Sequence, residues 1–339
     1  MSPDPASAKR RRDRGPDFLC IGAQKAATTW LYRNLADHPG IWLPEHVKEF
    51  HYFDDRAELL DQTWRRKLRG ERRPDVRWRR RVRTRLGTRT LSGLRWDARF
   101  YLRRPSDSWY RSLFVPAGTR ITGDMTPDYL ALPKRDIAVA AEVVPDARII
   151  LMIRNPIERL WSAVAYFRGQ AKGRAGRLER DEVLKFISSP RNLRLTDYIA
   201  GLRRWRDHYP ADRVFVGFTD DVTFNPAALL AAVHRFLGLD PAPAEAADER
   251  VNWTRSRDLP GWAAVALAEG LDDQLARSAR HFGLYARWWR HVGRRLIELG
   301  PEVSHTYPLT DGELWDGWWD RSRPPRLQSG VLSDIAPRL

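Results

Sequence analysis

The chain has 339 residues and is 42% hydrophobic, enough to bury a core in one large domain or two small ones, which excludes disorder of the whole chain. Its formal net charge of +16 favours an anionic partner or substrate, such as a nucleotide, a nucleic acid, an acidic glycan or a lipid head group. A general preference for arginine would produce the same excess of charge. Cys20 is the single cysteine, which excludes an intrachain disulfide and a thiolate metal site.

The beginning of the chain is basic and lacks an apolar segment, so we expect a disordered tail over residues 1–16. The run of about eighteen apolar residues that a membrane-spanning helix needs does not occur, and we expect a cytoplasmic protein without a transmembrane segment. Residues 17–339 are expected to form one domain. Within it, residues 64–104 are too charged for a core and are expected to be a surface insertion. Its arginines and tryptophans are either solvated or suited to peripheral contact with an anionic surface.

Apolar runs in the remaining sequence alternate with amphipathic segments. Strands are predicted at residues 17–22, 147–154 and 212–220. Helices are predicted at residues 28–40, 155–169 and 226–239, the first ended by Pro39 and Gly40 and the last by Gly238. This alternation predicts an α/β fold with a central, mostly parallel sheet flanked by helices. Ligands bind at the carboxyl ends of the strands in such sheets.

The turn after the first strand has the features of a phosphate site. A strand ending at Gly22, a tight turn and a helix starting near Ala27 place free backbone N–H groups and the positive end of a helix dipole together. Lys25 adds a full charge, and two threonines add hydroxyl donors. An ordinary turn with a surface lysine is the alternative. The candidate phosphate-binding residues are Gly22, Ala23, Gln24, Lys25, Ala26, Ala27, Thr28 and Thr29.

The spacing in this turn excludes two common nucleotide motifs. A Walker A loop has a second glycine directly before its lysine and a hydroxyl directly after it, whereas Gln24 and Ala26 stand here. A dinucleotide fingerprint needs two further glycines, which are missing. A phosphate cradle without an obvious metal remains.

Residues 22–29 resemble the 5′-phosphosulfate-binding loop of sulfotransferases that use 3′-phosphoadenosine 5′-phosphosulfate. Three further segments resemble the heparan-sulfate-type branch of that family in order and spacing: KEFHYF at 48–53, GDMTPDYL at 123–130 and RIILMIRNPIERLWSAVAYF at 148–167. The resemblance implies a P-loop-like fold, transfer of a sulfuryl group without a metal, and adenosine 3′,5′-bisphosphate as a product. Lys25 would then stabilise the charge that develops on the leaving oxygen, a task that suits a mobile point charge better than a planar guanidinium.

A second phosphate motif follows the strand at residues 147–154. Arg154 stands at the strand tip, Asn155 can cap the next helix, and Glu158 completes a pattern like a capping box. Ser162 lies two turns into the helix, so its hydroxyl and Arg154 can converge on one dianion. The resemblance assigns this pair to the ribose 3′-phosphate. The alternative is an ion pair of Arg154 with Asp146 or Glu158.

The segment KEFHYF supplies the candidate bases. If it is extended, Glu49, His51 and Phe53 share one face, and Lys48, Phe50 and Tyr52 share the other. The resemblance makes Glu49 the general base, with His51 and Asp54 orienting it or the acceptor, and the residues alone leave open which of Glu49 and His51 takes the proton. A polar strand edge with a Glu–Lys pair is the alternative.

Further site residues rest on the resemblance. Asp124 and Thr126 would bind the acceptor, although Asp-x-Thr-Pro is also a common turn, and Met125 stands where members acting on glycosaminoglycans often have lysine. Arg255 and Arg257 would approach the 3′-phosphate from a late loop.

The predicted function is therefore sulfuryl transfer to a hydroxyl group, with an amine as the second choice, of a small-molecule or glycan acceptor, and we expect no nucleic-acid partner. A metabolite kinase, recognised by its need for magnesium and ATP, is the alternative enzyme. A basic nucleic-acid-binding protein is the alternative without catalysis.

Overall fold

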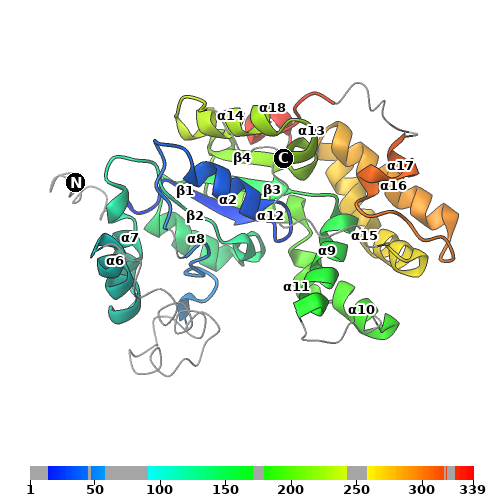
Figure 1. The fold of residues 1–339 in the computed structure, drawn as a ribbon, viewed down its shortest axis with the longest axis horizontal. Coiled ribbons are helices and arrows are strands. Elements are labelled where there is room, and N and C mark those ends of the chain that lie inside the picture. The colour runs from blue at the N-terminus through cyan, green and yellow to red at the C-terminus, as the bar shows by residue number, and fades with distance from the viewer. Residues whose placement is uncertain are drawn as a thin grey trace.

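A computed structural model of the chain describes residues 14–44, 47–57, 91–170, 179–242, 258–316, 318 and 325–339. These residues contain one five-stranded sheet with the order β2-β1-β3-β4-β5 (Figure 1). All neighbouring strands are parallel except β4 and β5, which are antiparallel. The mostly parallel α/β sheet expected from the sequence is therefore confirmed. The strands are β1 (Phe18–Gly22), β2 (Gly123–Asp124), β3 (Arg148–Ile153), β4 (Val214–Phe218) and β5 (Gly330–Val331).

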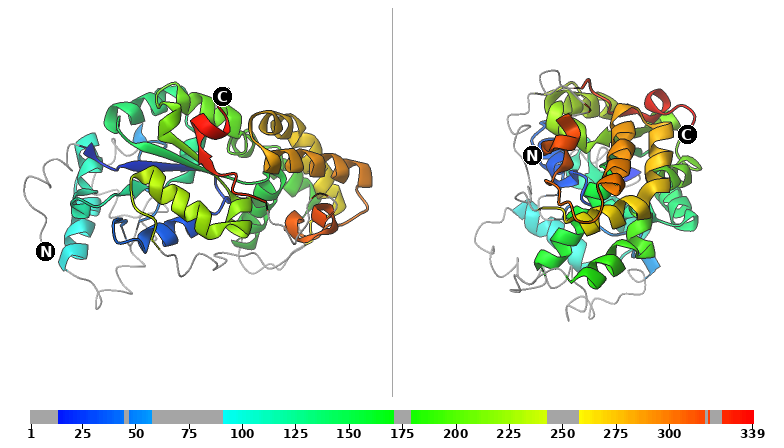
Figure 2. Two further views of the ribbon diagram at one scale, coloured as in Figure 1. Left: turned by 90° about the horizontal axis from the view of Figure 1, so that it is seen from above. Right: turned by 90° about the vertical axis from the view of Figure 1, so that its right-hand side faces the viewer.

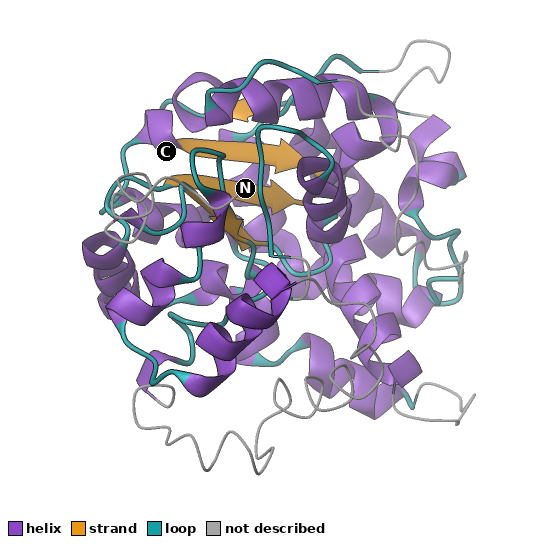
Figure 3. Ribbon diagram, turned by 60° about the vertical axis from the view of Figure 1, so that its left-hand side comes forward, coloured by secondary structure: helices purple, strands orange, loops and turns teal. Residues whose placement is uncertain are grey.

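The three predicted helices are also present, as α2 (Thr28–Ala36), α9 (Pro156–Gln170) and α14 (Pro226–Leu237). Helix α14 ends as expected, because Gly238 adopts a left-handed conformation with φ of 81° that a glycine tolerates without strain. β1 and β4 are buried along their length and β3 is buried after its first residue, and helices surround the sheet (Figure 3). Because both faces are covered, these three strands are apolar rather than alternating, apart from Arg148 at the start of β3.

Additional short elements complete the described part of the chain. They are α6 (Leu91–Leu102), α7 (Asp107–Ser112), η1 (Val115–Ala117), η2 (Pro127–Ala131), α8 (Lys134–Val143), α10 (Arg180–Ile187), α11 (Pro190–Arg194), α12 (Tyr198–Arg206), η3 (Ala211–Arg213), α13 (Thr219–Phe224), α15 (Gly261–His281), α16 (Leu284–Leu299), η4 (Leu309–Asp311), α17 (Glu313–Asp316) and α18 (Leu332–Ile335).

Two helical pairs lie at opposite ends of the molecule (Figure 2). At one end, α6 and α7 pack together, and Trp96 of α6 is buried with only 6% of its surface exposed. The expected surface insertion thus ends in a helix that joins the core, while residues 64–90 lie outside the described residues. At the other end, α15 and α16 pack against each other. They are followed by Trp315, which is buried, and Trp318, which is exposed, whereas Trp319 lies outside the described residues.

The expected tail lies mostly outside the described residues, which begin at residue 14. Gly15 and Pro16, at its end, are buried. From Phe18 the chain enters the middle of the sheet directly, between β2 and β3. The carboxyl ends of β1, β2 and β3 therefore meet at one edge, and they carry the three segments that the sequence singled out.

Candidate active site

The loop between β1 and α2 follows the expected strand-turn-helix course. Gly22 has φ of 153°, and a Cβ atom there would lie 2.9 Å from the carbonyl oxygen of Pro127, so a side chain does not fit. Within the part of the chain that the structure describes, the backbone N–H groups of Gln24, Lys25 and Ala27 have no acceptor. Free amides beside the amino end of a helix are suited to bind an anion.

Lys25 and Ala27 adopt left-handed conformations, with φ of 68° and 58°. The sequence placed the start of the helix near Ala27. Helix α2 begins one residue later, and Ala27 takes the backbone conformation for which glycine is better suited.

The Lys25 ammonium lies over the ring of Tyr166 of α9, 4.1 Å from its centroid. Burial lowers the pKa of Lys25 to about 8, and the positive charges of Arg154, Arg159 and Lys48 lower it further in the same direction. Several cations thus gather around one loop. Such a site gains electrostatic stabilisation when an anion binds.

Lys48 is a site residue that the sequence did not reveal, because an extended segment would have turned it away from Glu49. Its Nζ atom donates to the hydroxyl oxygens of Thr28, at 3.0 Å, and Thr29, at 3.2 Å, and lies 3.4 Å from the Glu49 carboxylate. The two threonines still have their own O–H groups to donate. Lys48 therefore connects the loop to the candidate base.

The extended conformation considered for residues 48–53 is not observed. His51 has φ of 53°, which breaks an extended chain, and residues 52–54 form a turn. Phe50, Tyr52 and Phe53 are all buried, because the aromatic side chains enter the core whichever strand face they would have occupied. Glu49 and His51 nevertheless come together.

His51 stands between two carboxylates. Its Nδ1 atom is 2.7 Å from Asp54 and its Nε2 atom is 3.6 Å from Glu49. Burial alone would lower the pKa of His51, but the hydrogen bonds to Asp54 and Glu49 outweigh it and raise the pKa well above its usual value. Burial would raise the pKa of Glu49, but the hydrogen bond to His51 and the charge of Lys48 lower it. At neutral pH Glu49 is therefore ionised and His51 protonated, so Glu49 is the member of this pair that is able to accept a proton.

Asp124 and Thr126, expected to bind an acceptor, are fully buried behind this segment. The Thr126 hydroxyl accepts from the backbone N–H of Phe50, at 2.9 Å, and donates to Asp124, at 2.6 Å. Asp124 also accepts from the phenols of Tyr110 and Tyr129. This network fixes the chain directly after Glu49 from the core side.

The second phosphate motif lies at the tip of β3. Both Nε and Nη2 of Arg154 are 2.9 Å from one carboxylate oxygen of Glu158, and Nη1 remains directed toward the loop, 3.5 Å from the carbonyl of Lys25. Ser162 is buried one turn beyond Glu158. The ion pair with Glu158 was one of the two considered from the sequence. The other proposed partner, Asp146, pairs with Arg213 instead.

The start of α9 is capped in one of the two ways expected. The Asn155 side chain accepts from the N–H of Ile157 at 3.1 Å, as predicted. Glu158 does not complete a capping box. Its second oxygen accepts from the N–H of Leu309 at 2.7 Å, because a distant segment of the chain reaches this carboxylate.

Arg159 is a further residue that sequence reasoning missed. It is fully buried, and its Nε atom donates to the carbonyl of Gln24 at 3.1 Å, while Nη1 donates to Thr196 at 2.9 Å. The Gln24 side chain donates to Asp128 at 3.0 Å, and Asp128 in turn pairs with Arg191. The loop is thus held from two sides. In a chain so rich in arginine, position 159 carried no signal that distinguished it from a surface residue.

Other expected features fall outside this cluster. Arg255 and Arg257 lie outside the described residues. In the described ranges, no group of three or more His, Cys, Asp or Glu residues is placed to hold a metal ion. No helix among the described residues is both long and apolar enough to cross a membrane.

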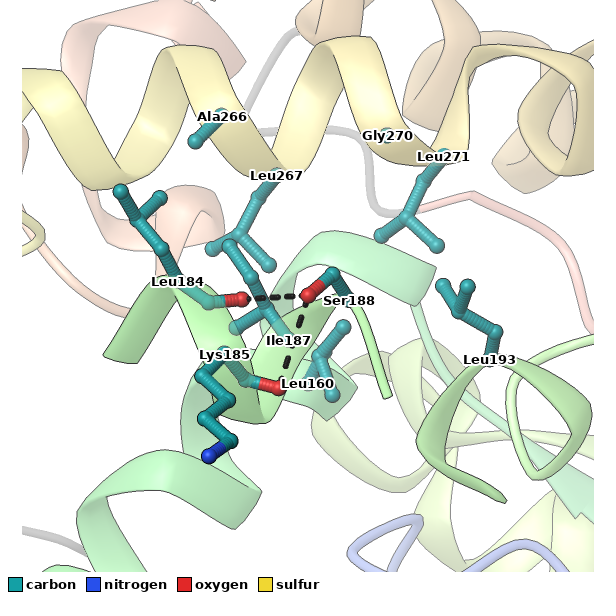
Figure 4. A pocket seen from close by; sticks show the side chains of 10 residues that line it. All are labelled: Leu160, Leu184, Lys185, Ile187, Ser188, Leu193, Ala266, Leu267, Gly270 and Leu271. Carbon is teal, nitrogen blue, oxygen red and sulfur yellow. Dashed lines mark hydrogen bonds between the residues drawn. The ribbon is translucent and has the colours of Figure 1, made fainter. Parts of the chain in front are cut away.

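A separate cavity of about 330 Å³ lies behind α9 (Figure 4). Side chains of α9, α10, α11 and α15 line it, and they are mainly aliphatic. Lys185 contributes its carbon stem, while its ammonium points away from α15. Lys25, Glu49 and Arg154 do not line this cavity, so it is distinct from the cluster described above.

The chain is similar to known proteins over most of its length. The sequence model of the sulfotransferase family matches residues 16–243. The human bifunctional heparan sulfate N-deacetylase/N-sulfotransferase 2 is 23% identical over 248 residues, which cover 69% of this chain and 23% of that protein. The corresponding enzyme of Drosophila melanogaster is 24% identical over 261 residues, covering 69% of this chain and 21% of that protein. The chain therefore matches about a quarter of the length of these relatives.

A solved structure shares the fold. The crystal structure of a sulfotransferase from Alicyclobacillus acidocaldarius superimposes with a TM-score of 0.52 and 21% sequence identity, covering 81% of this chain and 98% of that one. The identity is low, so this likeness concerns the arrangement of the sheet and its helices.

Proposed function

Because the chain belongs to the sulfotransferase family, we propose that it transfers a sulfuryl group from 3′-phosphoadenosine 5′-phosphosulfate to a hydroxyl group of a small-molecule or glycan acceptor. The observation that carries the proposal is the juxtaposition of an anion-binding loop with an ionised carboxylate. Lys48 joins the two, because it contacts the threonines of the loop and lies beside Glu49.

The donor fits the residues present. The free N–H groups of Gln24, Lys25 and Ala27, with the hydroxyls of Thr28 and Thr29, would hold the 5′-phosphosulfate. Arg154 and the hydroxyl of Ser162 would hold the 3′-phosphate. Glu158 orients the guanidinium, and Nη1 would exchange its long 3.5 Å hydrogen bond to the Lys25 carbonyl for one to the phosphate. The role of Arg255 and Arg257 in the same subsite stays a prediction.

The donor supplies the sulfuryl group, and the side chains divide the remaining work. The acceptor oxygen forms a bond to sulfur as the bond from sulfur to the 5′-phosphate oxygen breaks. Glu49 takes the acceptor proton, since it is the unprotonated member of the Glu49–His51 pair. Lys25, mostly protonated at neutral pH, stabilises the charge on the departing phosphate oxygen. His51 and Asp54 hold the Glu49 carboxylate in place.

Asp124 and Thr126 take a supporting role in this proposal. Both are fully buried, and their hydrogen bonds are made within the protein, so they position Glu49 without touching the acceptor. The relatives named above act on heparan sulfate according to their names, but the chain matches only about a quarter of their length. Met125 stands where members acting on glycosaminoglycans often have lysine, so this position provides no cation for an acidic sugar, and an uncharged hydroxyl acceptor is consistent with that. The cytoplasmic location and independence from metal and nucleic acid stay predictions.

The donor site can be tested by thermal stabilisation with adenosine 3′,5′-bisphosphate, AMP and ATP. A ligand at 100 times its dissociation constant adds about 2.7 kcal/mol to stability, so a preference for the bisphosphate is easily measured. Arg154→Ala should abolish this preference. Arg148→Ala is a matched control, because Arg148 begins the same strand and bonds the carbonyl of Leu237 far from the loop.

The result also separates the competing functions. Stabilisation by ATP with magnesium in preference to the bisphosphate would indicate a kinase. Equal stabilisation by all three nucleotides, with binding of nucleic acid that weakens steeply with salt, would indicate a nucleic-acid-binding protein. Either outcome would overturn the proposed function.

A further inference from the structure

A segment beyond the family-matched residues reaches the proposed 3′-phosphate subsite. It begins after α16 and is fixed by His305, whose backbone exchanges two hydrogen bonds of 2.9 Å with Leu259. Two residues later, Tyr307 is buried with 3% of its surface exposed. The backbone of Leu309 then bonds Glu158, so residues 305–309 are held at both ends.

Tyr307 lies against the residues assigned to the 3′-phosphate. Its phenol O–H is 3.3 Å from the carbonyl oxygen of Glu158, and the Arg154 guanidinium lies over its ring, 5.4 Å from the centroid. The Ser162 side chain is close enough to the same phenol to lower the pKa of Tyr307. Tyr307 is thus a neighbour of both Arg154 and Ser162, although it lies far from them in the sequence.

The chemistry of this neighbour suits a phosphate. Burial raises the pKa of Tyr307 above its usual value, and the nearby Arg154 offsets this only in part. The phenol therefore keeps its proton at neutral pH. Its current acceptor is a neutral carbonyl at the long distance of 3.3 Å, and a phosphate dianion held by Arg154 and Ser162 would be a stronger acceptor for the same proton.

We propose that Tyr307 is a third hydrogen-bond donor to the nucleotide 3′-phosphate, so that residues 305–309 set the preference for a 3′-phosphorylated nucleotide. This inference rests on the proposed function, which places the 3′-phosphate between Arg154 and Ser162. A hydrogen bond to a charged group contributes roughly tenfold or more in affinity. The contribution applies only to a nucleotide that carries the 3′-phosphate.

The test compares the affinities of adenosine 3′,5′-bisphosphate and AMP in the wild-type protein and in Tyr307→Phe. The substitution keeps the ring beside Arg154 and removes only the O–H group. We expect the preference for the bisphosphate to fall about tenfold, with AMP affinity unchanged within about twofold. Tyr209→Phe is the matched control, since Tyr209 is also buried and its phenol donates to the carbonyl of Val144 at 3.2 Å, away from α9.

The outcomes separate this inference from the function on which it rests. A purely structural role for Tyr307 would weaken both ligands equally, or neither, and would leave the preference unchanged. That result, with a preference that Arg154→Ala still abolishes, overturns the inference alone. A wild-type protein that binds the two nucleotides equally overturns both. Loss of preference in Tyr307→Phe but not in Tyr209→Phe, with both variants folded in a thermal melt, supports the proposal.

Discussion

The charge of Lys25 should make nucleotide binding depend on pH. The pKa of this lysine is lowered to about 8 by burial and by its cationic neighbours, so the ammonium loses its proton within the range where most lysines remain charged. Binding of a 5′-phosphate restores the proton, because an anion favours the charged form. Raising the pH must therefore weaken binding.

The size of the effect follows from the pKa. With a value of about 8, roughly nine-tenths of the free protein carries the ammonium at pH 7 and roughly one-tenth at pH 9. The affinity for adenosine 3′,5′-bisphosphate should fall about tenfold across this interval, which corresponds to about 1.4 kcal/mol. The other groups stay constant, because phosphates titrate near pH 6, arginines remain charged and the raised pKa of His51 keeps it protonated.

Isothermal titration calorimetry at pH 7 and pH 9 measures this change directly. Lys25→Arg keeps its charge, so its affinity should be nearly independent of pH. Lys25→Met should bind more weakly at pH 7 and should also be independent of pH. A wild-type affinity that is equal at the two pH values, or a Lys25→Met variant that still loses tenfold, would refute the reasoning.

Two further predictions concern the base and a buried carboxyl group. Glu49→Gln should lower turnover by roughly 10² or more with unchanged nucleotide affinity, and His51→Ala should lower it less, because only Glu49 accepts the proton; turnover near the wild-type rate in Glu49→Gln would show that the base is misassigned. Burial of Asp220 and the nearby charge of Glu158 raise the pKa of Asp220 to about 7, above its unfolded value, so stability falls as pH rises from about 4 to 7. Asp220→Asn should therefore increase the free energy of unfolding in urea, by up to about 4 kcal/mol at pH 8 and by clearly less at pH 5. The same gain at both pH values would contradict this assignment.

The elements of the sheet could be predicted from the sequence because their signal is local. The apolar runs that became β1, β3 and β4 are buried on both faces, and Arg154 and Asn155 follow β3 directly. β2 and β5 have two residues each, too few to show a pattern. The position of Ser162 followed from the period of the helix α9, which was itself correctly predicted.

The parts of the site that were missed depend on contacts distant in sequence. Tyr307 and Glu158 are separated by 149 positions, and no local pattern relates them. Lys48 was placed opposite Glu49 because an alternating segment was assumed, whereas the three aromatic residues that follow break the alternation by entering the core. Glu49 and His51 were brought together by a turn, so their pairing was predicted for the wrong geometric reason.

The half of the site around Glu49 and the half around Lys25 are supported by different elements. Aromatic residues beside Glu49 provide the support of the first half. Phe50 packs on Trp96 and Phe100 of α6, and Tyr52 stacks on Tyr110 of α7 at 4.4 Å between ring centroids. The loop around Lys25 rests on β1, β3 and α9 instead.

Changes in α6 and α7 can therefore reshape the surroundings of Glu49 while the loop around Lys25 keeps its support. Lys48 connects these two halves directly, because it contacts Thr28 in one and Glu49 in the other. Divergence in acceptor preference among proteins of this architecture should accumulate in the segments around α6, whereas the nucleotide half should tolerate little change. Exchange of α6 and α7 between homologues is accordingly the natural way to redesign acceptor preference.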